Sequence, residues 1–155
     1  MGLFSKKKES FTCPMTGTML TLENVPDEVF SKRMMGDGFA IDPSEGKVYA
    51  PMSGEITVAF PTKHAIGMKT KDGLELLIHI GMDTVELNGE GFTSHITAGK
   101  KVKQGELLME VDLDFIKKSG KPIITPVIFT GGEKVTLHKA DQKVSAGEEQ
   151  TITIG

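Results

Sequence analysis

Short apolar runs separated by turn-forming residues repeat along most of the chain. Runs of about four to eight apolar and β-branched residues, bounded by glycine, proline or aspartate, are typical of strands. The turns between them include PSEG, KDG, LNGEG and SAGEE, all of which favour chain reversal. We expect strands at residues 17–22, 47–51, 54–60, 65–70, 74–80, 105–111, 122–129 and 151–154.

Helical patterns are confined to two short segments, residues 25–34 and 113–120. Gly120 fits the end of the second, because glycine readily adopts the left-handed conformation that stops a helix. The pattern therefore predicts an all-β fold with one or two short helical turns.

Two pairs of segments within the chain resemble each other. CPMTGTM at residues 13–19 is echoed by APMSGEI at 50–56, and KVKQGELLMEV at 101–111 by KVSAGEEQTIT at 143–153. Each member combines a turn with the strand that follows. Two independent echoes favour a pseudo-duplicated β motif in a closed structure with few free edges.

We therefore expect one domain, an antiparallel β-sandwich or barrel-like fold, over residues 12–155. A flexible tail would precede it at residues 1–11. Leu3 and Phe4 lie beside the lysines at positions 6–8, so the tail could make weak contact with an anionic membrane surface.

Composition narrows the class of protein. The net charge of −3 argues against a nucleic-acid partner, which would need a concentrated basic face. The lone Cys13 cannot form an internal disulfide, so a cytoplasmic location is expected. No run of about 18 apolar residues occurs that would span a membrane.

The segment LLIHIGMDTVEL places His79 in the middle of an apolar strand. Alternate residues of a strand share a face, so Leu76, Ile78 and Ile80 would point one way and Leu77 and His79 the other. If the first set fills the core, His79 is displayed on the outer face. A displayed histidine suits a nucleophile that meets another protein, whereas a purely structural histidine is the alternative.

A second histidine, His64, precedes the neighbouring strand, and the turn KTKDG would bring it near His79. Two adjacent imidazoles resist being charged together, so both pKa values should fall. A neutral ring nitrogen could then attack phosphorus. Thr62 could orient the His64 ring through its hydroxyl, while His95 and His138 are expected on the surface.

The segments HAIG, LLIHIGMDTVELNGEGF, APMSGEI and MMGDGFAIDPSEGKVYAP closely resemble the glucose-family enzyme IIA component of the bacterial phosphoenolpyruvate:sugar phosphotransferase system. The resemblance runs from about residue 17 to the C-terminus. It implies a β-sandwich phosphocarrier that accepts a phosphoryl group from HPr and passes it to a cysteine of a sugar-specific IIB domain. No cofactor is implied beyond the covalent phosphoryl group, and regulation of partner proteins by phosphorylation would be compatible.

The same resemblance implies roles for individual residues. His79 matches the phosphorylated histidine, His64 the second active-site histidine needed for onward transfer, and Thr62 its hydrogen-bonding neighbour. An apolar docking patch with an acidic residue is implied at Val29, Phe30, Phe60, Leu77, Ile80 and Asp83. For Asp83, a surface-turn carboxylate without a role at the site is an equal alternative.

Two other classes remain open on the residues alone. A metal hydrolase could use His64, His79 and Asp83 as ligands, although a zinc ion bound adventitiously by the two histidines is the simpler metal hypothesis. In a swinging-arm carrier of the biotinyl or lipoyl type, the cofactor could be attached to Lys69 near a hairpin tip. Such domains do not need paired histidines.

Overall fold

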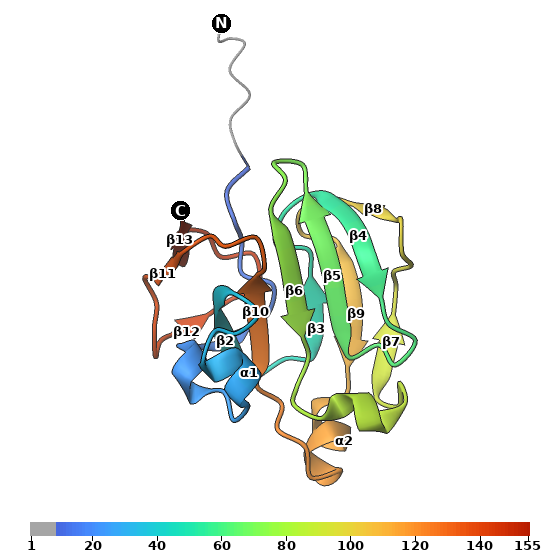
Figure 1. The fold of residues 1–155 in the computed structure, drawn as a ribbon. Coiled ribbons are helices and arrows are strands. Elements are labelled where there is room, and N and C mark those ends of the chain that lie inside the picture. Colours follow the sequence, from blue (N-terminus) through green and yellow to red (C-terminus); the bar gives the residue numbers. More distant parts are fainter. Residues whose placement is uncertain (1–8) are drawn as a thin grey trace, which may run out of the picture.

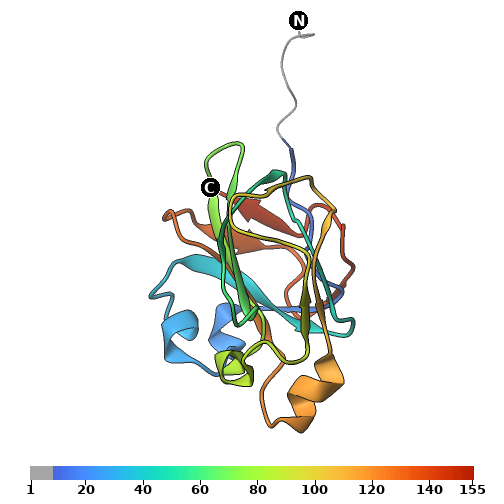
Figure 2. The ribbon, with the colours of Figure 1, turned by 90° about the vertical axis from the view of Figure 1, so that its right-hand side faces the viewer.

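An eight-stranded antiparallel sheet dominates the computed structural model, which describes residues 9–155. A three-stranded sheet lies behind it in Figure 1, and Figure 2 shows the β5–β6 hairpin and β9 as separate layers. The prediction of an antiparallel β-sandwich is confirmed. In spatial order the large sheet consists of β12 (Lys143–Val144), β1 (Gly17–Leu20), β2 (Asp37–Pro43), β10 (Thr125–Phe129), β6 (Glu75–His79), β5 (Ala65–Thr70), β4 (Gly54–Ala59) and β8 (Lys101–Val102).

The remaining elements are short. The three-stranded sheet contains β3 (Lys47–Tyr49), β9 (Leu107–Val111) and β7 (Phe92–Ser94), and a two-stranded ribbon contains β11 (Val135–Leu137) and β13 (Ile152–Ile154). The helices are η1 (Leu22–Asn24), α1 (Glu28–Ser31), η2 (Thr84–Leu87) and α2 (Leu113–Lys118). Within residues 9–155, no helix has both the length and the apolar character needed to cross a bilayer.

An aspartate side chain caps the N-terminus of each α-helix. Asp27 accepts a hydrogen bond from the N–H of Val29, and Asp112 accepts one from the N–H of Phe115, which satisfies N–H groups that the helix itself leaves free. Gly120 follows α2 with a φ of +78°, as expected for a residue that stops a helix. The two predicted helical turns are therefore confirmed.

The two sequence echoes correspond to two equivalent turn contacts. Thr16 Oγ1 accepts a hydrogen bond from the N–H of Ala146, and Ser53 Oγ accepts one from the N–H of Gln104, both at 2.9 Å. The strand pairing that follows is also equivalent: Gly17 faces Val144, and Gly54 faces Val102. The predicted pseudo-duplicated motif is thus present in the hydrogen bonding as well as in the sequence.

Strand β2 was missed by the sequence pattern, which predicts no element at residues 37–43 and treats PSEG at residues 43–46 as a turn. Gly38 lies inside this strand, and a Cβ there would come within 1.9 Å of the carbonyl oxygen of Val127 on β10. The glycine is needed because two backbones approach closely. Phe39, Ala40 and Ile41 are fully buried, so β2 lacks the alternation of a half-exposed strand.

The predicted flexible tail is too long at its C-terminal end. Phe11 is 7% exposed and packs edge-on against Phe39, and the Glu9 carboxylate accepts hydrogen bonds from the N–H and hydroxyl of Ser53. Residues 9–11 therefore belong to the domain. The predicted membrane contact involves residues 3–8, which lie outside the described residues.

The equivalent glycines of the duplicated turns provide a test of the fold. A Cβ on Gly17 would lie 2.2 Å from the carbonyl oxygen of Asp42, and one on Gly54 would lie 2.2 Å from that of Lys69. We expect Gly17→Ala and Gly54→Ala each to lower the free energy of unfolding by about 2–4 kcal/mol, because the paired strand must move. The measurement is urea denaturation, with exposed Thr57→Ala as the control. Stability unchanged in both glycine variants would contradict the described register.

Candidate active site

His79 is the last residue of β6, and strand alternation determines which way it points. Leu76, Ile78 and Ile80 are 3%, 0% and 1% exposed, while Leu77 and His79 are half-buried on the opposite face. The predicted display of His79 is confirmed. The expectation that Ile80 lines the docking patch is wrong, because the same alternation places its side chain in the core.

A backbone carbonyl fixes the orientation of the His79 ring. Nδ1 of His79 lies 2.7 Å from the carbonyl oxygen of Gly81, and a carbonyl can only accept a hydrogen bond. Nδ1 therefore carries the proton, and Nε2 keeps a free lone pair. Gly81 has a φ of +73°, and a Cβ there would lie 2.6 Å from Thr84 Cγ2 and 2.8 Å from the Pro122 carbonyl oxygen. This tight turn brings the carbonyl back to the ring.

His64 approaches His79 because it immediately precedes β5. Ala65 pairs with His79 across the β5–β6 ladder, and the N–H of Ile80 donates to the His64 carbonyl at 2.7 Å. The two imidazole centroids are 5.2 Å apart with an interplanar angle of 77°. Thr62 Oγ1 forms a 2.6 Å hydrogen bond with Nδ1 of His64. The structure thus brings together the three residues predicted from the sequence.

Burial lowers the pKa of both histidines below the ordinary value. For His64, the positive charge of a protonated His79 lowers the pKa further. For His79, the Gly81 carbonyl and the negative charges of Asp27 and Asp83 oppose the effect of burial. The direction predicted from the sequence is confirmed, but desolvation is the main cause for both rings. Charge coupling between the rings contributes only to the lowered pKa of His64. Both rings are predominantly neutral near pH 7.

Apolar side chains surround the two rings at different depths. Phe30 packs against His79 with centroids 5.1 Å apart, and Phe60 packs against His64 at 5.3 Å. Phe30 is only 5% exposed, so it supports the His79 ring and offers little contact area to a partner. Exposed apolar side chains lie next to these contacts. Val29 (40%) adjoins Phe30, Phe60 (39%) packs on His64, and Val85 (47%) follows Asp83, whose charge acts on His79. With half-buried Leu77 they form the apolar rim of the site.

Val85 is the rim residue that the sequence analysis missed. It follows the histidine strand in the sequence, and no role was predicted for it. The chain leaves β6 at Gly81 and enters the 3-10 helix η2 at Thr84, and this bend turns Val85 outward. The signal available was Gly81 followed by Asp83, which adopts a left-handed conformation with a φ of +57°.

Asp83 was predicted to be either an acidic residue of the site or a surface-turn carboxylate, and it has features of both. It is an exposed turn residue without a side-chain hydrogen bond at the start of η2, and its charge raises the pKa of His79. Asp27 acts on His79 in the same direction from the start of α1.

A salt-bridge network holds the segment around α1. Arg33 follows α1 and pairs with Glu23 at 3.2 Å and with Asp37 at 2.8 Å, which connects η1, α1 and the start of β2. Since α1 carries Val29 and Phe30, this network supports one side of the site.

The other candidate groups lie apart from this site. His95 and His138 are exposed, as expected, and contact Glu110 and Thr153. Burial raises the pKa of the Cys13 thiol to about 12, which makes it a poor nucleophile. Among residues 9–155 no group of three or more metal-ligating side chains is found, so the described residues do not supply the ligand set of the metal-hydrolase alternative.

The sequence and the fold are both similar to those of proteins of the sugar phosphotransferase system. The sequence model of the family described as "phosphoenolpyruvate-dependent sugar phosphotransferase system, EIIA 1" matches residues 9–135. The chain is 56% identical over 135 residues to the "PTS system glucosamine-specific EIICBA component" of Bacillus subtilis (strain 168), a match that spans 87% of this chain and 21% of that protein. Glucose permease IIA from Mycoplasma capricolum superposes with a TM-score of 0.85 and 44% identity, over 96% of this chain and 97% of that chain.

The electrostatics of the histidine pair can be tested by NMR titration of the ring protons. His79→Gln removes the neighbouring positive charge, so we expect the pKa of His64 to rise. Asp27→Asn removes a negative charge while keeping a residue able to cap α1, so we expect the pKa of His79 to fall. His138→Gln is the control that should change neither. A pKa of His79 above the ordinary value in the unmodified protein would contradict this description.

Proposed function

This chain belongs to the EIIA 1 family of the phosphoenolpyruvate-dependent sugar phosphotransferase system, and from that premise we propose that it carries a phosphoryl group on Nε2 of His79. The observation that carries the proposal is the hydrogen bond from Nδ1–H of His79 to the Gly81 carbonyl. It leaves Nε2 neutral and without a hydrogen bond to another described residue.

In the proposed reaction, HPr is the donor and carries a phosphohistidine of its own. The lone pair of His79 Nε2 attacks phosphorus and forms a new N–P bond. The N–P bond of the donor breaks, and its electron pair returns to the donor nitrogen. His79 keeps its Nδ1 proton throughout, so the phosphorylated ring gains positive charge. The Gly81 carbonyl and the nearby carboxylates of Asp27 and Asp83 would stabilise that charge.

We infer that His64 stabilises the phosphoryl group during onward transfer. If the Thr62 hydroxyl donates to Nδ1, the proton of His64 resides on Nε2, where it can donate to a phosphoryl oxygen. The ring separation of 5.2 Å and the near-perpendicular orientation support this role. Transfer then requires mainly positioning and charge stabilisation of the moving group.

The surroundings favour a phosphohistidine that survives until its acceptor arrives. Val29, Phe60 and Val85 form an apolar rim. Within residues 9–155 no carboxylate forms a hydrogen bond with either ring. The nearby carboxylates of Asp27 and Asp83 act on His79 through their charge, and an apolar rim that excludes water would slow hydrolysis. The proposed acceptor is the cysteine of a IIB domain, which would dock on the rim of Val29, Phe60, Leu77 and Val85.

Phosphorylation would also change the rim as a binding surface. A phosphoryl group adds roughly two negative charges to an apolar patch, so partners that prefer an apolar surface would bind the unmodified protein more tightly. Regulation of such partners is thus compatible with the carrier role. No cofactor is needed in the proposed reaction apart from the covalent phosphoryl group.

Intact mass after incubation with phosphoenolpyruvate, enzyme I and HPr tests the proposal. We expect the wild type and His64→Gln each to gain one acid-labile phosphoryl group and His79→Gln to gain none. In His64→Gln, transfer to a IIB domain should slow by about a hundredfold or more, because the glutamine amide cannot become positively charged and does not hold its donor where the imidazole Nε2 lies. His138→Gln is the matched control and should behave as wild type.

Two outcomes of this experiment would overturn the proposal. An unmodified wild type would remove the phosphotransfer function itself. A phosphorylated His79→Gln variant would leave that function in place and reject the assignment of the nucleophile.

A further inference from the structure

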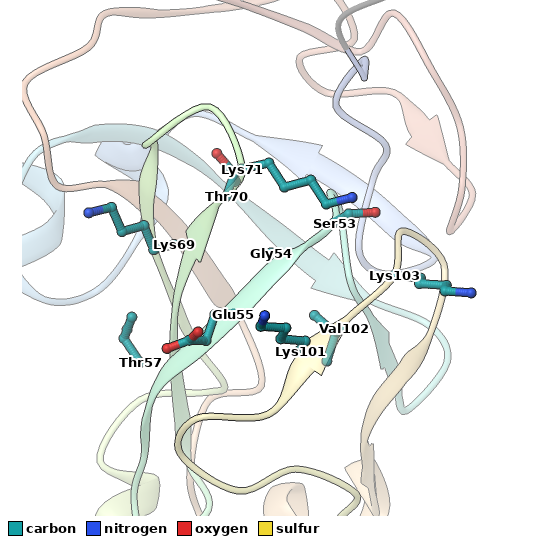
Figure 3. A pocket seen from close by; sticks show the side chains of 10 residues that line it. All are labelled: Ser53, Gly54, Glu55, Thr57, Lys69, Thr70, Lys71, Lys101, Val102 and Lys103. Carbon is teal, nitrogen blue, oxygen red and sulfur yellow. The ribbon is translucent and has the colours of Figure 1, made fainter. Parts of the chain in front are cut away.

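A hollow rich in lysine lies at the end of the molecule opposite the histidines. It has a volume of about 620 Å³. Its lining includes four lysines and a single carboxylate, that of Glu55, shown in Figure 3. We call this surface the lysine face and define it by Lys69, Lys71, Lys101 and Lys103.

The four lysines lie on the two strands that flank β4, namely β5 and β8, or directly after them. Glu55 on β4 pairs with Lys69 on β5 and with Lys101 on β8, so these two lysines flank β4 at roughly 10 Å from each other. Lys71 and Lys103 follow two residues later in their segments. Figure 3 shows the four side chains pointing in different directions over the face. All four are exposed, and none forms a salt bridge with another described residue.

Because the motif occurs twice, the four lysines can be compared with the residues at the equivalent positions of the other copy. In the other copy Thr18 occupies the place of Glu55 and pairs with Asp42 and Lys143. The N–H of Ser44 donates to the Thr16 carbonyl as that of Lys71 does to the Ser53 carbonyl. The residues that correspond in order to Lys69, Lys71, Lys101 and Lys103 are Asp42, Ser44, Lys143 and Ser145.

The same backbone arrangement therefore occurs twice, once with four lysines and once with a neutral set. The fold does not require the lysines, since the second copy forms without them. A concentration of positive charge on a chain whose net charge is −3 is unfavourable in itself and indicates attraction to an anionic partner.

We propose that the lysine face binds the anionic headgroups of a phospholipid surface. A small anion would need converging donors, and these ammonium groups spread over the face. A protein partner would be expected to find aromatic or large apolar anchors, and the lining contains none that is exposed. Spread lysines with aliphatic stems suit diffuse attraction to a charged membrane surface.

Binding there would leave the histidine site free. Strand β5 runs from Ala65, which pairs with His79, to Thr70 beside the lysine face, a length of roughly 17 Å. Figure 1 shows β8 and the turn between β5 and β6 at one end of the molecule and α1 and α2 toward the other. A molecule held at the membrane by this face would thus present its histidines away from the lipid. The proposal does not depend on phosphotransfer.

Co-sedimentation of the full chain with vesicles tests the proposal. Vesicles of phosphatidylcholine alone are compared with vesicles that also contain phosphatidylglycerol, at low and high ionic strength. We expect salt-sensitive binding only to the anionic vesicles. The combined variant Lys69→Gln, Lys71→Gln, Lys101→Gln and Lys103→Gln should bind at least about tenfold more weakly.

The matched control changes the net charge equally at other positions: Lys117→Gln, Lys118→Gln, Lys134→Gln and Lys143→Gln. It should retain most of the binding of wild type. Residues 1–8 are unchanged in every variant, so a lysine-face variant that binds like wild type would assign any binding to them and overturn the proposal. The proposal would also be overturned if the wild type did not bind anionic vesicles. Tighter binding of the wild type to duplex DNA than to anionic vesicles would overturn it as well.

Discussion

The hydrogen bond between Nδ1–H of His79 and the carbonyl of Gly81 is the interaction on which the proposed chemistry of this protein depends. It determines which ring nitrogen is free, and it exists only because the chain turns sharply where β6 ends. Gly81 permits that turn through its positive φ and its lack of a side chain in a space bounded by Thr84 and Pro122. Backbone geometry thus prepares His79 for its proposed role as nucleophile, without a carboxylate hydrogen-bonded to the ring.

The sandwich holds the second histidine in register with the first. Because Ala65 pairs with His79, the residue before β5 lies beside the residue that ends β6, and the rings meet at 5.2 Å. Burial keeps both rings neutral, and the nearby carboxylates moderate this effect at His79. The histidine pair and the lysine face lie at opposite ends of the β5–β6 hairpin, so the two surfaces are separated.

Sequence reasoning succeeded where a local pattern determines the structure. Alternation along β6 predicted that His79 is displayed, and the hairpin turn predicted its pairing with His64. It failed where tertiary packing overrides the local pattern. Strand β2 contains glycine because two backbones come close, and Val85 turns outward because the chain bends at Gly81. Ile80 was placed on the docking patch although its own alternation predicts burial, and Phe30 supports the ring from beneath.

The most direct test of this account is a long-range 1H–15N correlation spectrum of the phosphorylated protein with 15N-labelled histidine. The spectrum identifies the ring nitrogen that carries the phosphoryl group and the nitrogen that keeps its proton. The account predicts phosphorylation at Nε2 of His79 with Nδ1 still protonated and bonded to the Gly81 carbonyl. A phosphoryl group on Nδ1 of His79, or on His64, would contradict it.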